Sequence, residues 1–229
     1  MTARDHPLDR AVWNALTSRQ ASLALHEGGV VRFDPAYATF AAAGPDASPR
    51  DWLSLTTATG RVALFEADAV VPEGLVEVDR IDCLQMTATQ INAGGRTVAF
   101  EALTDADGPE MLALATLTQP GPFFSKTHLL GPFIGIRHEG QLVALAGERM
   151  SLDGFSEISG VCTHPDHRGH GYAGALMRAV GQRILDRGDT VFLHARIGHA
   201  ATIAFYETLG FRPRITPGYV VMEAVPAIS

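Results

Sequence analysis

The segment Val161-Cys-Thr-His-Pro-Asp-His-Arg-Gly-His-Gly-Tyr-Ala173 carries the strongest chemical signal in the chain. Its first residues read as the end of a strand, and a helix is expected to begin directly after the glycines. Gly169 and Gly171 allow successive backbone amides to turn inward without a Cβ clash, and the helix N-terminus adds further free donors. Such a loop is suited to hold a pyrophosphate. Taken as a lone pair of glycines, the segment is equally compatible with a tight strand-to-helix turn that exposes an arginine.

The residues on both sides of this loop alternate between strand and helix signals. Leu176, Val180 and Ile184 recur at steps of four after Tyr172, which predicts a helix that Gly188 ends. We expect further strands over 97–100, 133–137, 141–145, 155–163, 191–194 and 219–222, and further helices over 107–115 and 200–209. The order β-α-β-β-β-α-β-α-β predicts a mixed α/β domain.

The N-terminal part of the chain reads as mixed α/β without a chemical signature. Residues 8–16 show helical spacing, and Ser48-Pro49 is a typical helix start, with serine as cap and proline in the first turn. Strands are expected over 29–33, 61–65 and 75–78, and Asn92-Ala-Gly-Gly95 reads as a linker. We therefore expect a smaller α/β region over residues 1–94 and a second domain over residues 95–229.

Composition excludes several classes of protein. Apolar residues make up 46% of the 229 residues and charged residues 19%, which is typical of a globular protein. No stretch approaches about 18 uninterrupted apolar residues and the first residues lack an apolar segment, so we expect neither a membrane span nor a signal peptide. The two cysteines, Cys83 and Cys162, favour a reducing, cytoplasmic location over a disulfide framework. The net charge of −7 argues against a nucleic-acid partner.

Two sequence blocks resemble the GNAT acetyltransferase superfamily. The block Arg168-Gly-His-Gly-Tyr-Ala173 fits R-x-x-G-x-A, which is similar to the superfamily's acetyl-CoA-binding pattern Q/R-x-x-G-x-G/A. The block His199-Ala-Ala-Thr-Ile-Ala-Phe-Tyr206-Glu-Thr-Leu-Gly-Phe211 resembles its N-x-x-A-x-x-L-Y-x-x-x-G-F pattern. The resemblance covers about residues 96 to 223 and is nearest to the FR47-like and glycine N-acyltransferase-like group. It implies a GNAT fold, with a mixed, mostly antiparallel sheet and flanking helices after the N-terminal region.

The resemblance also implies an activity and the residues that carry it. The expected enzyme is an N-acetyltransferase that moves an acetyl group from acetyl-CoA directly to a primary amine. Glu157, eleven residues before Arg168, is the expected base, with Glu148 as the alternative, and Tyr206 is the expected acid. The residues expected to contact acetyl-CoA are Val161, Cys162, Thr163, Arg168, Gly169, His170, Gly171, Tyr172, Ala173 and His199. A bulge that parts their strand from its neighbour would free the amides of Val161 and Thr163 for the cofactor.

Several alternatives stay open. The same cleft could serve a non-catalytic acyl-CoA sensor. A nucleotide hydrolase is a poorer alternative, because the chain has no G-x-x-x-x-G-K-[ST] motif. Cys162 with His164, His167 and His170 is weighed as a zinc site and set aside, so no metal is expected. Phe123 and Phe124 are equally candidates for the acceptor wall and for ordinary core. Residues 1–94 are either a degenerate half of a tandem acetyltransferase or a lid and dimer surface. The amine acceptor, small molecule or protein, and a homodimer are not decided by the sequence.

Overall fold

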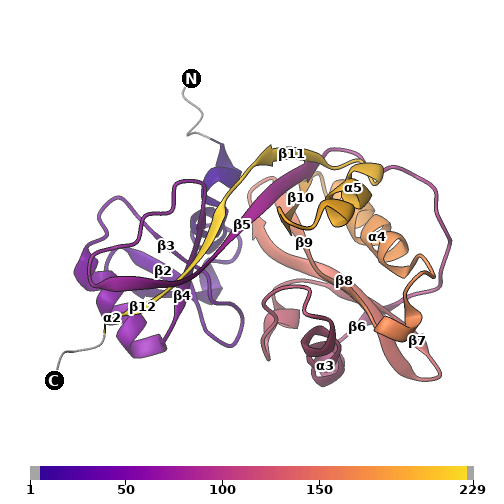
Figure 1. The fold of residues 1–229 in the computed structure, drawn as a ribbon, viewed down its shortest axis with the longest axis horizontal. Helices are drawn as coiled ribbons and strands as arrows, with labels where there is room; N and C mark the ends of the chain where they lie inside the picture. Colours follow the sequence, from indigo (N-terminus) through magenta and orange to yellow (C-terminus); the bar gives the residue numbers. More distant parts are fainter. Residues whose placement is uncertain (1–5, 226–229) are drawn as a thin grey trace.

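One large sheet organises the protein. In the computed structural model, which describes residues 6–225, nine strands form this sheet and three form a smaller one (Figure 1). Eight strands follow the order β4 (Val62–Glu66), β12 (Gly218–Ala224), β5 (Leu75–Ala88), β10 (Thr190–Arg196), β9 (Phe155–Thr163), β8 (Gln141–Leu152), β7 (Phe133–His138) and β6 (Glu101–Leu103). The ninth, β11 (Arg212–Ile215), pairs with β5. Only β9 and β10 are parallel neighbours among these strands, so the sheet is mixed and mostly antiparallel, as predicted.

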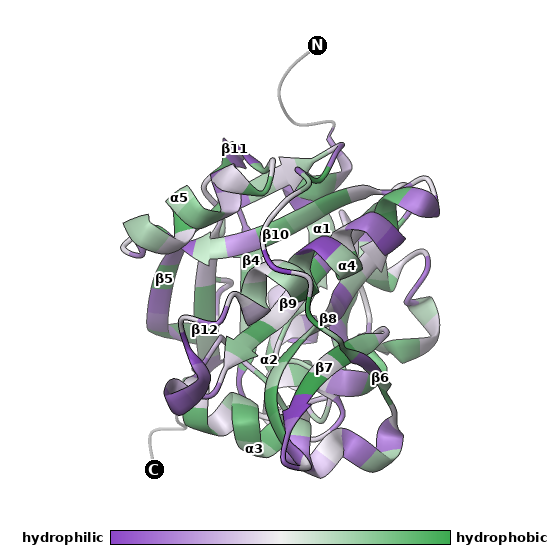
Figure 2. Ribbon diagram, turned by 90° about the vertical axis from the view of Figure 1, so that its right-hand side faces the viewer, coloured by the Kyte–Doolittle hydropathy of each residue, from purple (hydrophilic) through white to green (hydrophobic). Residues whose placement is uncertain are grey.

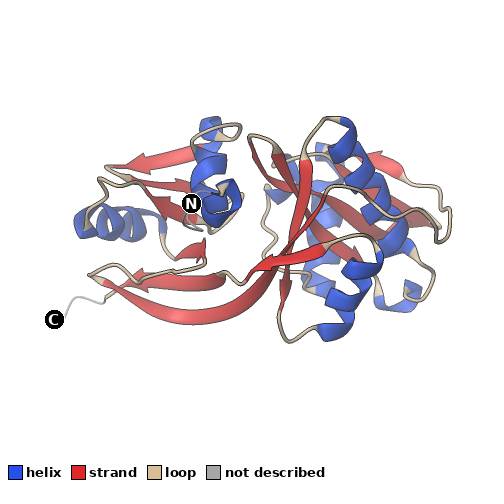
Figure 3. Cartoon of the chain, turned by 90° about the horizontal axis from the view of Figure 1, so that it is seen from above, coloured by secondary structure: helices blue, strands red, loops and turns tan. Residues whose placement is uncertain are grey.

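Strand β5 extends through both halves of the molecule (Figures 1 and 3). Its residues 75–82 pair with β12, and its residues 83–88 pair with β10. The sequence analysis expected a strand only over 75–78, because the polar residues that follow in the middle of β5 are exposed and hide the strand pattern. The division into 1–94 and 95–229 stays a prediction. Strand β5 lies before this boundary in the sequence, and it pairs with β10, β11 and β12, which all lie after the boundary.

The N-terminal region adds a three-stranded antiparallel sheet with helices around it. The strands are β1 (Ala24–Glu27), β2 (Val30–Phe33) and β3 (Ala41–Ala43), and the helical elements are η1 (Pro7–Arg10), α1 (Ala11–Leu16), η2 (Ala21–Leu23) and α2 (Pro49–Thr59). Helix α2 begins at Pro49 because Ser48 and Asp51 satisfy each other's backbone amides in a capping box. The predicted helices over 8–16 and after Ser48 are therefore confirmed.

Two helices pack on opposite faces of the sheet near the glycine loop. Helix α3 (Gly108–Thr118) packs with Phe133, Leu142 and Leu145, whereas α4 (Tyr172–Asp186) packs with Ile134 and Val143. Neighbouring residues of one strand thus face different helices, which is the two-residue alternation of a β-strand. The remaining helical elements are η3 (Asp105–Asp107), η4 (Thr127–Leu129), η5 (Pro165–His167) and α5 (Ala200–Thr208). Figure 2 shows the hydrophobic colouring along β7 and β8, between α3 and α4.

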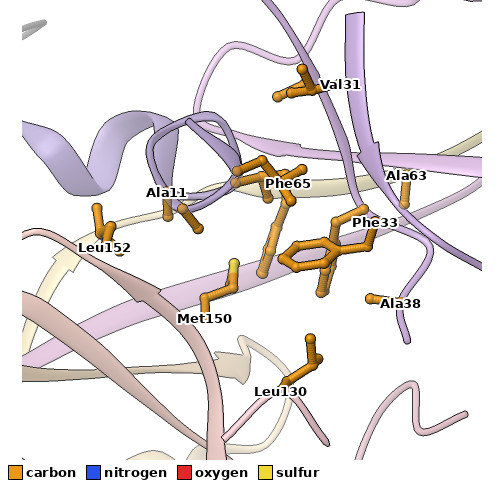
Figure 4. Close-up of a cluster of buried hydrophobic side chains, with 14 of the residues drawn as sticks. Ala11, Val31, Phe33, Ala38, Ala63, Phe65, Leu130, Met150 and Leu152 are labelled. Carbon is orange, nitrogen blue, oxygen red and sulfur yellow. The ribbon is translucent and has the colours of Figure 1, made fainter. Parts of the chain in front are cut away.

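The N-terminal region and the rest of the chain share one hydrophobic core. Met150 and Leu152 of β8 and Leu130 pack in the same buried cluster as Phe33 and Phe65 (Figure 4). Each of these side chains is at most 7% exposed. Burying apolar surface contributes roughly 25 cal/mol per Å², so the cluster couples the stability of the two regions. Within residues 6–225, no helix combines the length and the hydropathy that a membrane span requires.

One predicted strand is wrong, and three strands, β1, β3 and β11, were not expected. Residues 97–100 form no strand, and β6 begins at Glu101 instead. Pairing of Glu101 with Gly135, together with an ion pair from Arg137 to Glu101 at 2.6 Å, fixes this edge register and leaves 97–100 outside the sheet. Strand β11 follows α5 and was not predicted, because Arg212-Pro-Arg-Ile215 has no buried position and contains a proline.

Candidate active site

Strands β9 and β10 part beyond Glu157 and leave an opening in the sheet. Only the first three residues of β9 pair with β10. Beyond them, the amide of His164, which follows β9, donates to the carbonyl of Val143 on β8 at 2.8 Å. Because the amides of a strand alternate in direction, those of Thr163 and Val161 point away from β8 and toward the opening. The β8–β9 register shifts between these residues and the start of β9, as expected for a bulge.

The glycine loop leads directly into helix α4. Gly169 and Gly171 both have a φ of 79°, a left-handed conformation that glycine adopts without strain. Among the described residues, the amides of residues 169–174 donate no hydrogen bond to a protein acceptor. Unpaired amides at the N-terminus of a fifteen-residue helix form an anion-binding site, and Arg168 adds a positive charge beside it. The loop therefore fits a pyrophosphate.

Two adjoining cavities follow β9 from this loop toward the N-terminal region. The loop borders a cavity of about 590 Å³, and a second cavity of about 1060 Å³ lies beyond it. Val161 and Arg168 line both, so the two cavities meet along the free edge of β9. The walls of these cavities contain all the site residues expected from the sequence: Glu157, Val161, Cys162, Thr163, Arg168, Gly169, His170, Gly171, Tyr172, Ala173, His199 and Tyr206.

Glu157 lies at the point where β9 and β10 part, and it is fully buried. Arg149 donates to both of its carboxylate oxygens, from Nε at 2.8 Å and from Nη2 at 2.7 Å. His194 lies 2.7 Å from Oε1 through its Nδ1, and the amide of Met150 donates to Oε2 at 3.4 Å. Burial alone would raise the pKa of Glu157, but the charge and hydrogen bonds of Arg149, with help from His194, lower it to about 2.

The hydrogen bonds around His194 define its tautomer. Gln85 directs its Nε2 to the carbonyl of Leu8 at 3.0 Å and its Oε1 to Arg214 at 2.9 Å, which fixes the orientation of the amide. The same Nε2 lies 3.1 Å from Nε2 of His194, so this ring nitrogen accepts. Nδ1 therefore carries the hydrogen and donates to Glu157. Burial lowers the pKa of His194, in keeping with a neutral ring at neutral pH.

Tyr206 and His199 come to the second cavity from helix α5. His199 is exposed at the N-cap of the helix, and Tyr206 is partly buried against Phe205 and Phe211. Burial raises the pKa of Tyr206 to about 12, so its phenol is protonated at neutral pH. Among the described residues, its hydroxyl has no hydrogen-bond partner, which leaves this proton available to a group in the cavity.

The other residues weighed in the sequence lie further from the chemistry. Glu148 is buried against Arg187 at 2.6 Å and lines neither cavity, which favours Glu157 over it as the acidic residue of the site. Phe123 lines the second cavity, and Phe124 lines neither. The side chain of Cys162 packs in the core beneath α3, where burial raises its pKa to about 11.

The histidines of the loop do not gather into a metal site. The rings of His164 and His167 are 5.8 Å apart, and within residues 6–225 no three His, Cys, Asp or Glu side chains are grouped as metal ligands.

The sequence analysis missed the residues that close the far end of the second cavity. Phe40 and Phe65, from the N-terminal region, stack at 5.6 Å between ring centroids, and Tyr219 of β12 meets both rings edge-on at 5.8 Å. Arg149 lies over the Phe40 ring at 4.8 Å. All four residues line the cavity, together with Arg61. The signal available for Arg149 was a charged pair, Glu-Arg, within an otherwise apolar strand continuing beyond 145.

Comparisons with known proteins agree with this architecture. A family model described as FR47-like protein matches residues 133–220. A solved structure from Novosphingobium aromaticivorans, described as an acetyltransferase from the GNAT family, is 38% identical with a TM-score of 0.88, and the match covers 97% of this chain and 100% of that one. Among curated proteins, none is significantly similar in sequence.

Two more distant structures share the fold. A GCN5-related N-acetyltransferase from Kribbella flavida is 19% identical with a TM-score of 0.61, and the match covers 95% of this chain and 94% of that one. A tandem GNAT protein from the clavulanic acid biosynthesis pathway is 13% identical with a TM-score of 0.54, over 87% of this chain and 79% of that one. The full-length match at 38% identity shows that the chain belongs to the GNAT family of acetyltransferases.

Proposed function

We propose that the protein transfers an acetyl group from the thioester of acetyl-CoA directly to a primary amine. The observation that carries this proposal is the set of unpaired amides along the groove, on the free edge of β9 and in residues 169–174. The loop amides suit a pyrophosphate, and the strand amides suit the amide-bearing arm that follows it in coenzyme A. From Glu157 to Thr163 the strand spans about 20 Å at about 3.3 Å per residue, which separates the loop from the proposed reaction centre.

The cavity supplies a group for each charge that the transfer creates. The amine nitrogen attacks the carbonyl carbon, and amides at the free edge of β9 stabilise the oxyanion that forms. The C–S bond then breaks, and Tyr206 gives its proton to the departing thiolate. Glu157 takes the proton that the nitrogen loses, and later releases it to solvent. The support for these roles is the position of both side chains in the cavity wall and the protonated state of the phenol.

We also propose that the N-terminal region forms the acceptor end of the site. Phe40, Arg61 and Phe65 come from residues 1–94 and line the cavity beyond Glu157, on the side away from the glycine loop.

Acyl-CoA binding without turnover is the alternative function, and one observation favours it. All hydrogen-bonding positions of Glu157 are occupied by protein groups, which is typical of a structural ion pair as well as of a poised catalytic group. Binding and turnover must therefore be measured separately.

The first experiment is a calorimetric titration with acetyl-CoA of the wild type and of two glycine variants. Gly171→Asp places a carboxylate in the proposed phosphate site, and Gly154→Asp makes the same change at a turn with nearly the same φ, 78°, outside both cavities. We expect Gly171→Asp to abolish saturable binding and Gly154→Asp to retain it. Equal binding by both variants would place acetyl-CoA elsewhere.

The second experiment measures release of free coenzyme A with a panel of primary amines. We expect amine-dependent release by the wild type that falls in Tyr206→Phe without weaker acetyl-CoA binding. Binding without release for any amine would establish the alternative, an acyl-CoA-binding protein without turnover.

A further inference from the structure

The acidic residue at the reaction centre has no free position for a proton. Each carboxylate oxygen has two lone pairs, so Glu157 can accept four hydrogen bonds. Oε1 receives Nη2 of Arg149 and Nδ1 of His194, both at 2.7 Å, and Oε2 receives Nε of Arg149 at 2.8 Å and the amide of Met150 at 3.4 Å. A proton can reach this carboxylate only when it displaces one of these donors.

His194 is equally committed. Its Nδ1 hydrogen points at Glu157, and its single remaining lone pair, on Nε2, receives a hydrogen from Gln85 at 3.1 Å. Gln85 is 1% exposed, so this nitrogen faces the protein interior. The neutral ring therefore has no free lone pair to offer an ammonium ion in the cavity.

The other groups around Glu157 are no better suited. Cys83 of β5 and Tyr219 of β12 face the same polar cluster, and burial raises the pKa of both, to about 11 for the thiol. They are protonated at neutral pH and accept no proton. Asp79 and His199 line the cavity as well, but both are exposed. The positive charge of Arg149 balances the negative charge of Glu157, so the cluster gives an ammonium ion little net attraction.

We propose, on the basis of the transfer reaction proposed above, that the acceptor is a weakly basic amine of the α-amino class that enters the site as the free base. Its nitrogen already has the lone pair that attacks the thioester, so no protein group has to deprotonate it beforehand. Once the new C–N bond has formed, the nitrogen is far more acidic than an ammonium ion. At that stage even a weak base suffices, and Glu157 takes the proton on Oε2 in place of the 3.4 Å hydrogen bond from the Met150 amide.

The expected preference for the α-amine follows from the fraction of each amine that is unprotonated at pH 7. An α-amino group with a pKa near 8 is about one-tenth unprotonated at pH 7, whereas a lysine side chain near 10.4 is unprotonated to about 0.04%. The free-base advantage is therefore about 250-fold for the α-amine. The greater nucleophilicity of the more basic amine offsets part of this factor. We therefore expect kcat/KM at pH 7 to be at least about tenfold higher for the α-amine than for the side-chain amine.

Two isomers test the proposal with the full-length protein. Nε-acetyl-lysine amide offers a free α-amine, and Nα-acetyl-lysine amide offers a free side-chain amine on the same set of atoms. The rate of coenzyme A release is measured for both at saturating acetyl-CoA between about pH 6.5 and 10. We expect the α-amine isomer to be favoured at pH 7, and kcat/KM for each isomer to rise until the pH reaches the pKa of its own amine.

The remaining outcomes separate this proposal from the proposed function. A preference for the side-chain amine at pH 7, or one common break between about pH 6.5 and 8 for both isomers, would show a protein base at work and would overturn the proposal while leaving the transferase intact. Acetyl-CoA binding without release to either isomer or to the amine panel would overturn both. Loss of the common break in His199→Gln would then identify the base, and Glu207→Gln, an exposed residue outside both cavities, is the control.

Discussion

Replacing Glu157 with glutamine is expected to lower the free energy of unfolding by about 3 kcal/mol at pH 7. The carboxylate is fully buried, and Arg149 and His194 hold it in its charged form at 2.7 Å each. Burial opposes this charge, yet the two partners lower the pKa from 4.5 to about 2. At about 1.4 kcal/mol per pKa unit, this difference is worth about 3 kcal/mol. An independent expectation agrees, because removing one partner of a buried ion pair typically costs about 3–5 kcal/mol.

The direction of the pH dependence follows from the lowered pKa. Since Glu157 has a lower pKa in the folded than in the unfolded protein, the unfolded chain binds more protons as the pH falls. Its stabilising contribution is complete above about pH 4.5 and is lost as the pH falls through about 2. The stability difference between wild type and Glu157→Gln should therefore shrink across this window, whatever other groups titrate in both proteins.

Urea unfolding monitored by tryptophan fluorescence measures this difference at several pH values between 7 and 2. Trp52 is 4% exposed and reports the loss of the native environment. Glu207→Gln, at an exposed position in α5, is the matched control and should change stability by less than about 0.5 kcal/mol. A loss below about 1 kcal/mol at pH 7, or a loss of equal size at every pH, would refute the assigned pairing of Glu157.

Further variants test the groove and the core. Tyr206→Phe should lower kcat at least about tenfold with the affinity for acetyl-CoA unchanged, because it removes only the hydroxyl that donates the proton. Tyr37→Phe, outside both cavities, is the control and should have no effect. Arg168→Ala should weaken acetyl-CoA binding measured by calorimetry by less than about tenfold, since the loop amides remain, and a complete loss would contradict amide-dominated binding. Phe65→Leu should raise KM for the amine and leave the affinity for acetyl-CoA unaltered; the reverse pattern would contradict an acceptor end built by the N-terminal region. Leu176→Ala should lower the free energy of unfolding by about 2–5 kcal/mol in urea titrations, because this side chain of α4 is 0% exposed.

Local signals were sufficient to predict the C-terminal part of the fold. The four-residue spacing from Tyr172 and the closing Gly188 predicted α4, and the strand predicted over 155–163 is β9. The residues that decide where these elements begin and end are close together in the sequence, so the local pattern is sufficient to predict them. Edge strands were less predictable, because β6 and β11 have few buried positions and depend on pairing with distant residues.

The candidate site was predictable where it depends on backbone conformation. The amides of the glycine loop follow from the local sequence, and the structure places them at the N-terminus of a long helix. The partners of Glu157 were not predictable, because Arg149 and His194 approach it from two other strands. No sequence spacing shows that two side chains will share one carboxylate. The same holds for Phe40 and Phe65, which reach the cavity only through the fold of the N-terminal region.

The position of β12 between β4 and β5 has a consequence for synthesis of the protein on the ribosome. Strands β4 and β5 are made early, but the strand that hydrogen-bonds to both consists of residues 218–224. Until these residues emerge, β4 has no partner along this edge, and Tyr219 is missing from the proposed acceptor end. Pairing between residues so far apart is slow to form, because a long loop must close first. A chain that stopped after α5 would contain the complete glycine loop proposed to hold acetyl-CoA, but the proposed acceptor end would be unfinished.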